Sequence, residues 1–317
     1  MFIEQAYKGR NDLWRTLIVS LLWVGFFLVN FLYVYFLSPA ELDAVYESMR
    51  SLPNNLALIG SLLPFAFLLG VLLLLVFLLH QRSLLTLTTA RRKLDFGRVL
   101  FSFVLVVILT VVGFVISYYY DSSQIIWNFR PLDFAILVVI SLLLFPIQIA
   151  FEEYLFRGYL MQQVGILVKN RWMPLVLTSV LFGLAHLSNP EVAEMGIGIM
   201  AFYIGTGLLL GIMTLMDDSI ELALGYHFGN NLMASLLITS DFSALQTDAM
   251  FKYAGVVDTT DMLREMLLTM LITYPLILLI LALKYKWTNW RLKLTGSVQS
   301  EREFLQIQNP NHDSAIL

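Results

Sequence analysis

The sequence predicts an all-α protein, a polytopic integral membrane bundle of about eight transmembrane helices with both termini in the cytoplasm. Of its 317 residues, 58% are hydrophobic and only 14% are charged, and the mean hydropathy is +0.76. That composition is typical of helical membrane proteins and not of soluble domains. Long apolar runs recur along the chain, and Lys and Arg gather in alternate connections between these runs.

A window of roughly 20 apolar residues, the length that crosses the hydrocarbon core, locates the expected spans. They lie near 14–37, 56–79, 99–120, 132–163, 172–188, 196–216, 219–239 and 265–283. The first lacks a small-residue cleavage site, so we interpret it as an anchor and not as a signal peptide. The seventh is the least apolar, because it contains Glu221, His227, Asn230 and Asn231.

The basic residues support eight spans. In this arrangement, only Arg50, Arg130, Lys252 and Arg264 of the 20 Lys and Arg fall on the outer side. The positive-inside rule then places both termini in the cytoplasm. Without the seventh span, the basic C-terminal segment would lie outside, so the charges favour keeping it.

The overall charge and the cysteine count exclude several functions. A net charge of −3 and a pI near 5.8 give no reason to expect a nucleic acid partner. The chain has no cysteine, so disulfides and thiolate catalysis are absent.

Two adjacent carboxylates, Glu152 and Glu153, interrupt the fourth apolar run. Ionisable residues inside a membrane are costly and mark functional sites. Glu153 and Arg157 are four residues apart on a helix, so we expect them to form an ion pair. Glu152 lies about 100° around the helix axis and need not join that pair. We expect it to be the chemically active carboxylate, since an unpaired carboxylate in an apolar wall suits general base catalysis.

Two histidines also fall in apolar runs. His186 follows Phe182 by four residues, and His227 precedes Asn231 by four, which places His227 and Asn231 on one helix face. Each alone is consistent with ordinary interhelical hydrogen bonding. Together with Glu152 they predict one polar site built by three helices, whereas His80 lies outside this pattern and we expect His80→Ala to behave as wild type.

The three motifs Glu152-Glu153-x3-Arg157, Phe182-x3-His186 and His227-x3-Asn231 resemble those of the CPBP family. This family comprises CAAX prenyl proteases of the Rce1 type and bacterial Abi and bacteriocin-processing homologues, which are glutamic intramembrane endopeptidases. The similarity covers roughly residues 130–240.

The resemblance implies a role for each of these residues. Glu152 would be the base that activates water, and His186 would help to hold that water. His227 and Asn231 would stabilise the oxyanion, while Glu153 and Arg157 would brace the site. No cofactor is implied, and the water is expected to enter from the cytoplasmic side.

The same reasoning divides the chain into four parts. Residues 1–130 form the first three spans with a cytoplasmic interfacial segment at 83–97, and residues 131–240 form the catalytic core. Residues 241–290 hold an outer loop and the last span. Residues 291–317 form a polar cytoplasmic tail that we expect to be loosely ordered.

Three alternative functions remain open. Glu152, His186 and His227 could instead bind a catalytic zinc ion, although the chain has no His-Glu-x2-His pair on one helix. A proton-coupled transporter would also place Glu and His in the membrane, and a non-catalytic scaffold or immunity protein could retain the motifs. The expected partners are the lipid bilayer and a membrane-associated protein or peptide substrate, whose identity the sequence does not give. The plasma membrane of a bacterium is the favoured location.

Overall fold

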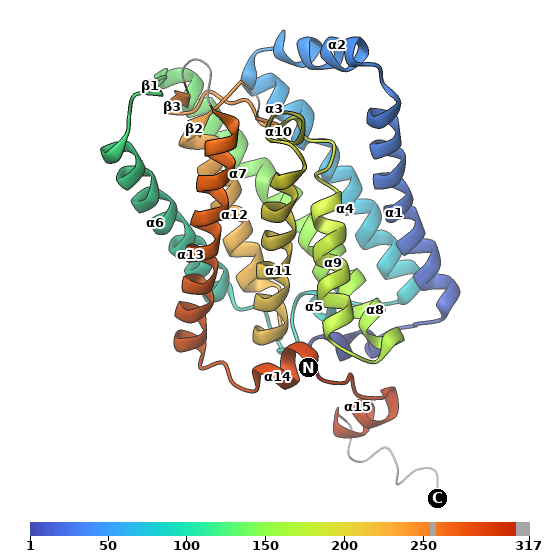
Figure 1. Cartoon of the computed structure of the whole chain (residues 1–317). Helices are drawn as coiled ribbons and strands as arrows, with labels where there is room; N and C mark the ends of the chain where they lie inside the picture. The colour runs from blue at the N-terminus through green and yellow to red at the C-terminus, as the bar shows by residue number, and fades with distance from the viewer. Residues whose placement is uncertain (242, 254–257, 309–317) are drawn as a thin grey trace, which may run out of the picture.

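The computed structural model describes residues 1–241, 243–253 and 258–308, and its long helices stand side by side in one bundle (Figure 1). Among the described residues, six helical segments are long and apolar enough to cross a membrane. They are Leu13–Phe36, Asn54–His80, Phe96–Tyr120, Pro131–Val168, Ile197–Asp217 and Thr259–Tyr285. The chain is therefore a multi-pass membrane protein, as expected.

Three of these six segments are single helices and three are built from consecutive ones. The single helices are α1 (Leu13–Phe36), α6 (Phe96–Tyr120) and α13 (Thr259–Tyr285). The composite segments are α3 (Asn54–Leu62), α4 (Pro64–Leu75) and the π-helix η2 (Val76–His80); α7 (Pro131–Glu153), the π-helix η3 (Tyr154–Leu160) and α8 (Met161–Val168); and η4 (Ile197–Ile199) with α11 (Met200–Asp217).

The expected fifth and seventh spans are also helices, α9 (Trp172–Leu184) and α12 (Glu221–Leu236). Both are shorter than the roughly 20 residues of a full crossing. They lie inside the bundle: α9 packs against α11, and α12 packs against α6, α7 and α11. The bundle thus contains two short helices that depend on their neighbours for stability. α12 carries His227, and α9 ends just before His186.

Burial separates the central helices from those that face lipid. Only 11% of the apolar window is buried in α1, α6 and α13, against 61% in η4–α11. Two glycines allow the central helices to approach closely, as small residues do in membrane bundles. A Cβ at Gly207 would lie 2.8 Å from the Ser179 carbonyl oxygen of α9, and one at Gly225 would overlap the Val99 carbonyl oxygen of α6.

A small three-stranded sheet departs from the all-α expectation. Its order is β1 (Ile125–Trp127), β3 (Phe251–Tyr253), β2 (Ile238–Thr239). β3 pairs antiparallel to β1 and parallel to β2. The sheet lies at the end of the bundle away from the N-terminus (Figure 1), and we call this end the sheet end. It orders part of the expected outer loop, of which Phe242 and residues 254–257 lie outside the described residues.

Shorter helices lie at both ends of the bundle. They are η1 (Ile3–Lys8), α2 (Pro39–Arg50), α5 (Leu84–Thr88), α10 (Pro190–Met195), α14 (Trp290–Thr295) and α15 (Glu301–Gln308). The expected interfacial segment 83–97 is helical only in α5 and at its last two residues, where α6 begins. Its next part is tied to the bundle by a bridge between Thr89 and Ser219.

The expectation of a loosely ordered tail is wrong for residues 291–308. Val298 and Phe304 are buried in one cluster with Ile3, Ala6 and Tyr7 of η1. The composition of the tail is polar, but its few apolar side chains are spaced to cover the N-terminal segment. Residues 309–317 lie outside the described residues.

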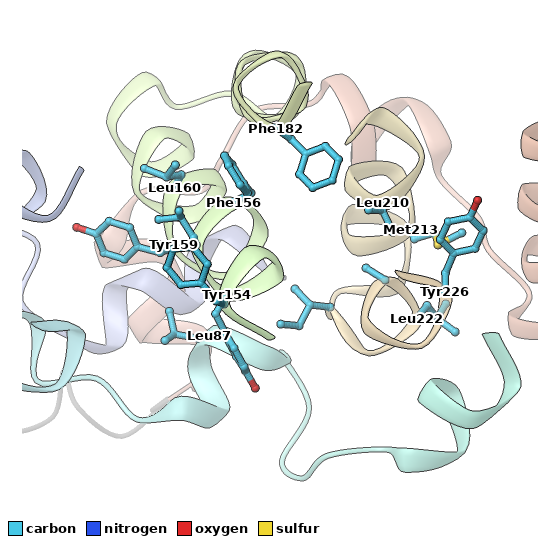
Figure 2. Close-up of a cluster of buried hydrophobic side chains, with 14 of the residues drawn as sticks. Leu87, Tyr154, Phe156, Tyr159, Leu160, Phe182, Leu210, Met213, Leu222 and Tyr226 are labelled. Atoms are coloured by element: carbon cyan, nitrogen blue, oxygen red, sulfur yellow. The ribbon is translucent and has the colours of Figure 1, made fainter. Parts of the chain in front are cut away.

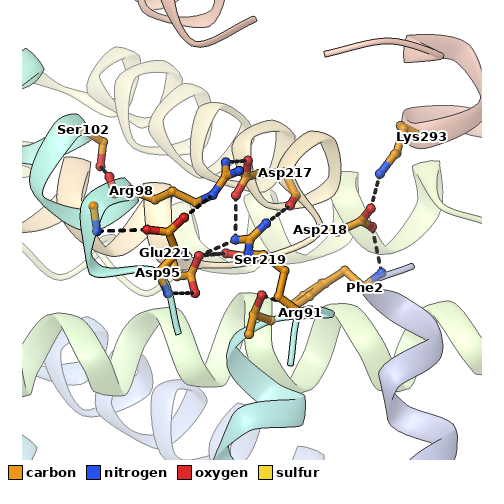
Figure 3. Close-up of polar contacts among 12 residues, drawn as sticks. Phe2, Arg91, Asp95, Arg98, Ser102, Asp217, Asp218, Ser219, Glu221 and Lys293 are labelled. Carbon is orange, nitrogen blue, oxygen red and sulfur yellow. Dashed lines mark hydrogen bonds and ion pairs between the residues drawn. The ribbon is translucent and has the colours of Figure 1, made fainter. Parts of the chain in front are cut away.

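A polar network fixes the turn between α11 and α12 at the end where the termini lie (Figure 3). The Arg91 guanidinium contacts both Asp217, at 3.0 Å, and Glu221, and Arg98 also contacts Asp217. Burial lowers the pKa of Arg91, but the two carboxylates outweigh it, so that the pKa is raised overall. Arg91 therefore stays charged at any physiological pH and holds the start of α12 in place.

Candidate active site

The two adjacent carboxylates lie at the end of α7, immediately before the π-helix η3. α7 continues through Pro146 without interruption, and the helix changes from α to π only after Glu153. Single π-helical turns are rare and occur frequently at functional sites. Both glutamates are buried, with Glu152 7% and Glu153 0% exposed, so neither faces lipid.

The predicted ion pair between Glu153 and Arg157 is present. Glu153 Oε1 lies 2.8 Å from Arg157 Nη1, and both side chains are fully buried. Arg157 also donates to the Gly207 carbonyl oxygen at 3.1 Å and lies 4.5 Å from the ring centre of Phe182. The pair thus joins the end of α7 to α9 and α11, which brings the three helices of the site together.

His227 of α12 lies between the two carboxylates. Its Nδ1 is 2.8 Å from Glu153 Oε1, and its Nε2 is 3.6 Å from Glu152 Oε2. A carboxylate only accepts hydrogen bonds, so Nδ1 carries the proton on that side. Glu153 therefore fixes the orientation of the ring and directs Nε2 toward Glu152.

A second link between α7 and α12 runs through Gln148, one helical turn before Glu152. The Gln148 amide nitrogen donates to Glu152 Oε1, and the Gln148 amide oxygen accepts from Asn231 Nδ2 at 3.2 Å. Gln148 was not among the predicted site residues. Its spacing of four residues from Glu152 was the available signal, because it places both side chains on one helix face.

His186 lies just after the end of α9. Its Nδ1 donates to the Phe182 carbonyl oxygen at 2.8 Å, which leaves Nε2 as the acceptor of the neutral ring. The imidazole stacks on the ring of Tyr203 in α11, with the ring centres 4.5 Å apart. Tyr203 is a further contact that the sequence did not reveal.

A cavity of about 400 Å³ joins these groups. Glu152, His186 and Asn231 line it together with Gln148 and Tyr203. His227 does not line this cavity and is 4% exposed, so it contacts Glu152 from within the protein. Three of the four predicted catalytic side chains thus line one cavity, and the fourth, His227, lies next to Glu152.

The lining of the cavity continues from Glu152 to Asn189, Glu191 and the segment Ser243–Leu245, which lie at or near α10 and the sheet (Figure 1). Tyr154, Phe182 and Leu222 belong to a cluster of buried apolar side chains next to the carboxylates (Figure 2). Entry of water from the cytoplasmic side stays a prediction.

The alternative zinc ligands do not form a metal site in this structure. Across residues 1–241, 243–253 and 258–308, no three His, Asp or Glu side chains are grouped so that they could hold one metal ion.

The surroundings of His80 do not fit the expectation that His80→Ala behaves as wild type. It is fully buried, with its Nδ1 2.7 Å from the Arg10 carbonyl oxygen and its Nε2 2.9 Å from the Tyr159 hydroxyl. Loss of these two bonds would leave buried polar groups unpaired, so His80→Ala should lower stability.

The fold and this cluster define a class of protein: a multi-pass membrane protein whose helices enclose ionisable residues around one cavity. Residues 133–233 match the family described as type II CAAX prenyl endopeptidase Rce1-like. The chain is also 30% identical over 246 residues to the uncharacterized protein YyaK of Bacillus subtilis (strain 168), covering 73% of this chain and 80% of that protein. No solved structure matches. The chain belongs to the Rce1-like CAAX protease family, and the matched segment contains every residue of the candidate site.

Proposed function

We propose that this protein is an intramembrane endopeptidase of the glutamic type, which hydrolyses a peptide bond of a membrane-associated protein or peptide. The observation that carries the proposal is the placement of Glu152. Its carboxylate lines a cavity that it shares with His186 and Asn231, and its Oε2 is buried without a hydrogen-bond partner among the described residues. Buried polar groups are normally paired, and we assign the unused hydrogen-bonding capacity of this oxygen to the attacking water.

In the proposed reaction, Glu152 removes a proton from water, and the water oxygen bonds to the carbonyl carbon of the substrate. The carbonyl oxygen becomes an oxyanion, which the Asn231 amide and His227 stabilise. When the C–N bond breaks, the protonated Glu152 gives its proton to the leaving nitrogen. His186 Nε2 holds the attacking water. Loss of one oxyanion donor typically costs about 10²–10³ in rate.

The contacts of His227 set a condition on this role. Its Nδ1 proton is directed to Glu153, so Nε2 donates only when the ring is an imidazolium with both nitrogens protonated. Glu153 Oε1 lies 2.8 Å from Nδ1 and holds the ring in this orientation. Arg157 in turn offsets the charge of Glu153, which keeps the buried group of charges near balance.

We propose further that the bundle has eight crossings and lies in a bacterial plasma membrane with both termini in the cytoplasm. The basic residues Arg91, Arg171 and Lys293 contact acidic partners near α5, α9 and α14. These elements are at the end where the termini lie (Figure 1). The positive-inside rule assigns that end to the cytoplasm.

The activity can be tested by comparing protein termini in membranes of cells that express the wild type or Glu152→Gln. We expect a set of new N-termini with the wild type that is absent with Glu152→Gln. Glu301→Gln, an exposed carboxylate in α15, is the matched control and should give the wild-type set. Identical termini with wild type and Glu152→Gln would contradict the proposal.

Treatment with a chelator distinguishes a glutamic from a zinc mechanism. We expect purified protein, once a cleaved peptide is known, to keep its activity after treatment with a chelator. Loss of activity that only zinc restores would replace the glutamic mechanism by the metalloprotease alternative.

A further inference from the structure

Glu191 is a second carboxylate in the lining of the cavity that contains Glu152. It lies in the first turn of α10, and it lines the same cavity of about 400 Å³ as Glu152, His186 and Asn231. The reaction proposed above gives it no role. The lining contains these two glutamates and neither Lys nor Arg, so its fixed charges are negative.

The hydrogen bonds of Glu191 occupy only one of its two oxygens. Oε1 accepts from the Ala244 backbone amide at 2.8 Å, which ties α10 to a segment that also lines the cavity. Oε2 is buried and has no hydrogen-bond partner among the described residues, and no basic side chain in that part of the chain acts on Glu191. Burial of a charge is costly unless the charge is paired. Glu191 therefore has capacity for a cationic donor that the protein itself does not supply.

The side chains around Glu191 in the lining are uncharged. The Asn189 amide nitrogen donates to the Tyr203 hydroxyl at 3.2 Å, so these two polar groups are engaged with each other. Phe27, Phe65 and Phe156 give the lining apolar surface. A long basic side chain suits this combination, because its methylene stem packs on apolar surface while its charged head reaches a polar group.

From the cavity lining and the unpaired oxygen of Glu191, we infer that Glu191 forms a subsite for a Lys or Arg side chain of a polypeptide substrate, close to the peptide bond that Glu152 cleaves. The charge of Glu191 attracts a basic side chain and disfavours an acidic one, so it selects among substrates. The substrates are then membrane-associated polypeptides with a basic residue beside an apolar segment. Binding of the basic side chain stands without the chemistry, whereas its place next to the cleaved bond rests on the proposed function.

Binding is measured first, on protein that does not cleave. Purified full-length Glu152→Gln in detergent is incubated with a library of short peptides of random sequence, and the retained peptides are sequenced by mass spectrometry. We expect enrichment of Lys and Arg, and loss of that enrichment when Glu191→Gln is added. The amide oxygen of Gln can still accept from Ala244, so this variant removes the charge and keeps the contact. Glu194→Gln, exposed on the same helix, is the matched control and should retain the enrichment.

The affinity of one retained Lys peptide then gives the size of the effect. Replacing its Lys by norleucine should weaken binding to Glu152→Gln by roughly 10- to 100-fold, the effect of one charge-assisted hydrogen bond. The same replacement should change nothing once Glu191→Gln is present. Equal enrichment of basic residues with and without Glu191→Gln would overturn the inference, and so would a Glu152→Gln protein that retains no basic peptides preferentially.

Cleavage of the same library by active protein locates the subsite relative to the reaction. We expect Lys or Arg at a fixed position from the new terminus, and Asp or Glu at that position with Glu191→Lys. A basic preference that persists in Glu191→Lys would overturn the assignment of this subsite to Glu191. Absence of cleavage by the wild type would instead refute the proposed function, and the binding comparison would still decide whether Glu191 takes a basic side chain.

Discussion

Glu153 accepts hydrogen bonds from Arg157 and His227 through the same oxygen atom. Arg157 Nη1 and His227 Nδ1 both lie 2.8 Å from Glu153 Oε1. Glu152, one residue earlier, has Gln148 as its hydrogen-bonding neighbour and no arginine. The adjacent carboxylates therefore have different roles. Glu153 holds Arg157 and His227 in place, and Glu152 lines the cavity.

This division predicts different effects on stability. Glu153→Gln leaves the Arg157 guanidinium buried without a counter-charge, and breaking a buried pair typically costs about 3–5 kcal/mol. Glu152→Gln removes no such pair and should melt near the wild type. Thermal unfolding of the two variants in detergent checks this, and equal melting temperatures would contradict the assignment.

Gln148 connects the carboxylate and the amide of the site, so its removal should affect rate more than stability. Gln148→Ala deletes one bond to Glu152 and one to Asn231. Misplacing a reacting group by about 1 Å can cost about 10²-fold in rate, so we expect a loss of roughly 10- to 100-fold. Cleavage of an identified substrate measures this loss, with the exposed Gln124→Ala as control. A Gln148→Ala enzyme of full activity would show that Glu152 needs no positioning.

The sequence could reveal the charged residues of the site but not their uncharged partners. Glu152 and Glu153 stand out because carboxylates are rare in apolar runs, and the spacing of Arg157 predicted its partner. Gln148 and Tyr203 are uncharged, so neither stood out from the sequence as the carboxylates did. Only the packing of α7 on α12 and of the His186 segment on α11 gives them a role.

At the scale of elements, α10 meets the segment after β2 through one buried carboxylate. Glu191 Oε1 accepts from the Ala244 amide at 2.8 Å, and its Oε2 is buried without a partner among the described residues. Burial raises the pKa of Glu191 above its ordinary value of 4.5, although the hydrogen bonds act against that rise. The folded protein therefore holds this proton more tightly than the unfolded chain does.

The sign of the resulting pH dependence follows from linkage. The stabilisation by protonated Glu191 is fully present below pH 4.5 and is lost as the pH rises through the raised folded-state pKa. Glu191→Gln stays neutral, so it should melt above the wild type at neutral pH, with the difference vanishing near pH 4.5. Melting temperatures across this range measure it. Glu194→Gln, exposed on the same helix, should follow the wild type, and a Glu191→Gln difference independent of pH would refute the argument.

Long apolar helices could be predicted from the sequence, and elements that depend on tertiary contacts could not. Each of the eight expected runs contains a helix. Apolar length identifies the longest of them, and the charge pattern was needed for the seventh. The strands β1 and β3 have three residues each and β2 has two, too few for any period to be recognised. η1 and α15 are polar in composition, and their burial comes from contact with each other.

At the scale of the whole molecule, the distribution of charge and the course of the cavity give complementary information. The Lys and Arg pattern can be read from the sequence, and it predicts which end of the bundle faces the cytoplasm. The course of the cavity depends on where the short helices α9 and α12 end and on which side chains pack around them. No periodicity in the chain contains that information.

The structure also joins the first and last elements of the chain, which can be tested by releasing one of them. Phe304 of α15 is 3% exposed, and its ring centre lies 6.0 Å from that of Tyr7 in η1. Replacing a buried phenylalanine by alanine typically costs about 3–5 kcal/mol. We expect Phe304→Ala to detach α15 and so to expose the segment after Thr295 to proteases.

Leu305 provides the matched control, because it is the next residue and is 40% exposed. A surface substitution usually changes stability by less than about 0.5 kcal/mol, so Leu305→Ala should resist limited proteolysis like the wild type. Mass spectrometry of the fragments locates the cleavage. Equal resistance of Phe304→Ala and Leu305→Ala would show that the contact between η1 and α15 does not hold the tail, and that another contact, such as the hydrogen bond from the Tyr7 hydroxyl to the Gln299 carbonyl oxygen, does so instead.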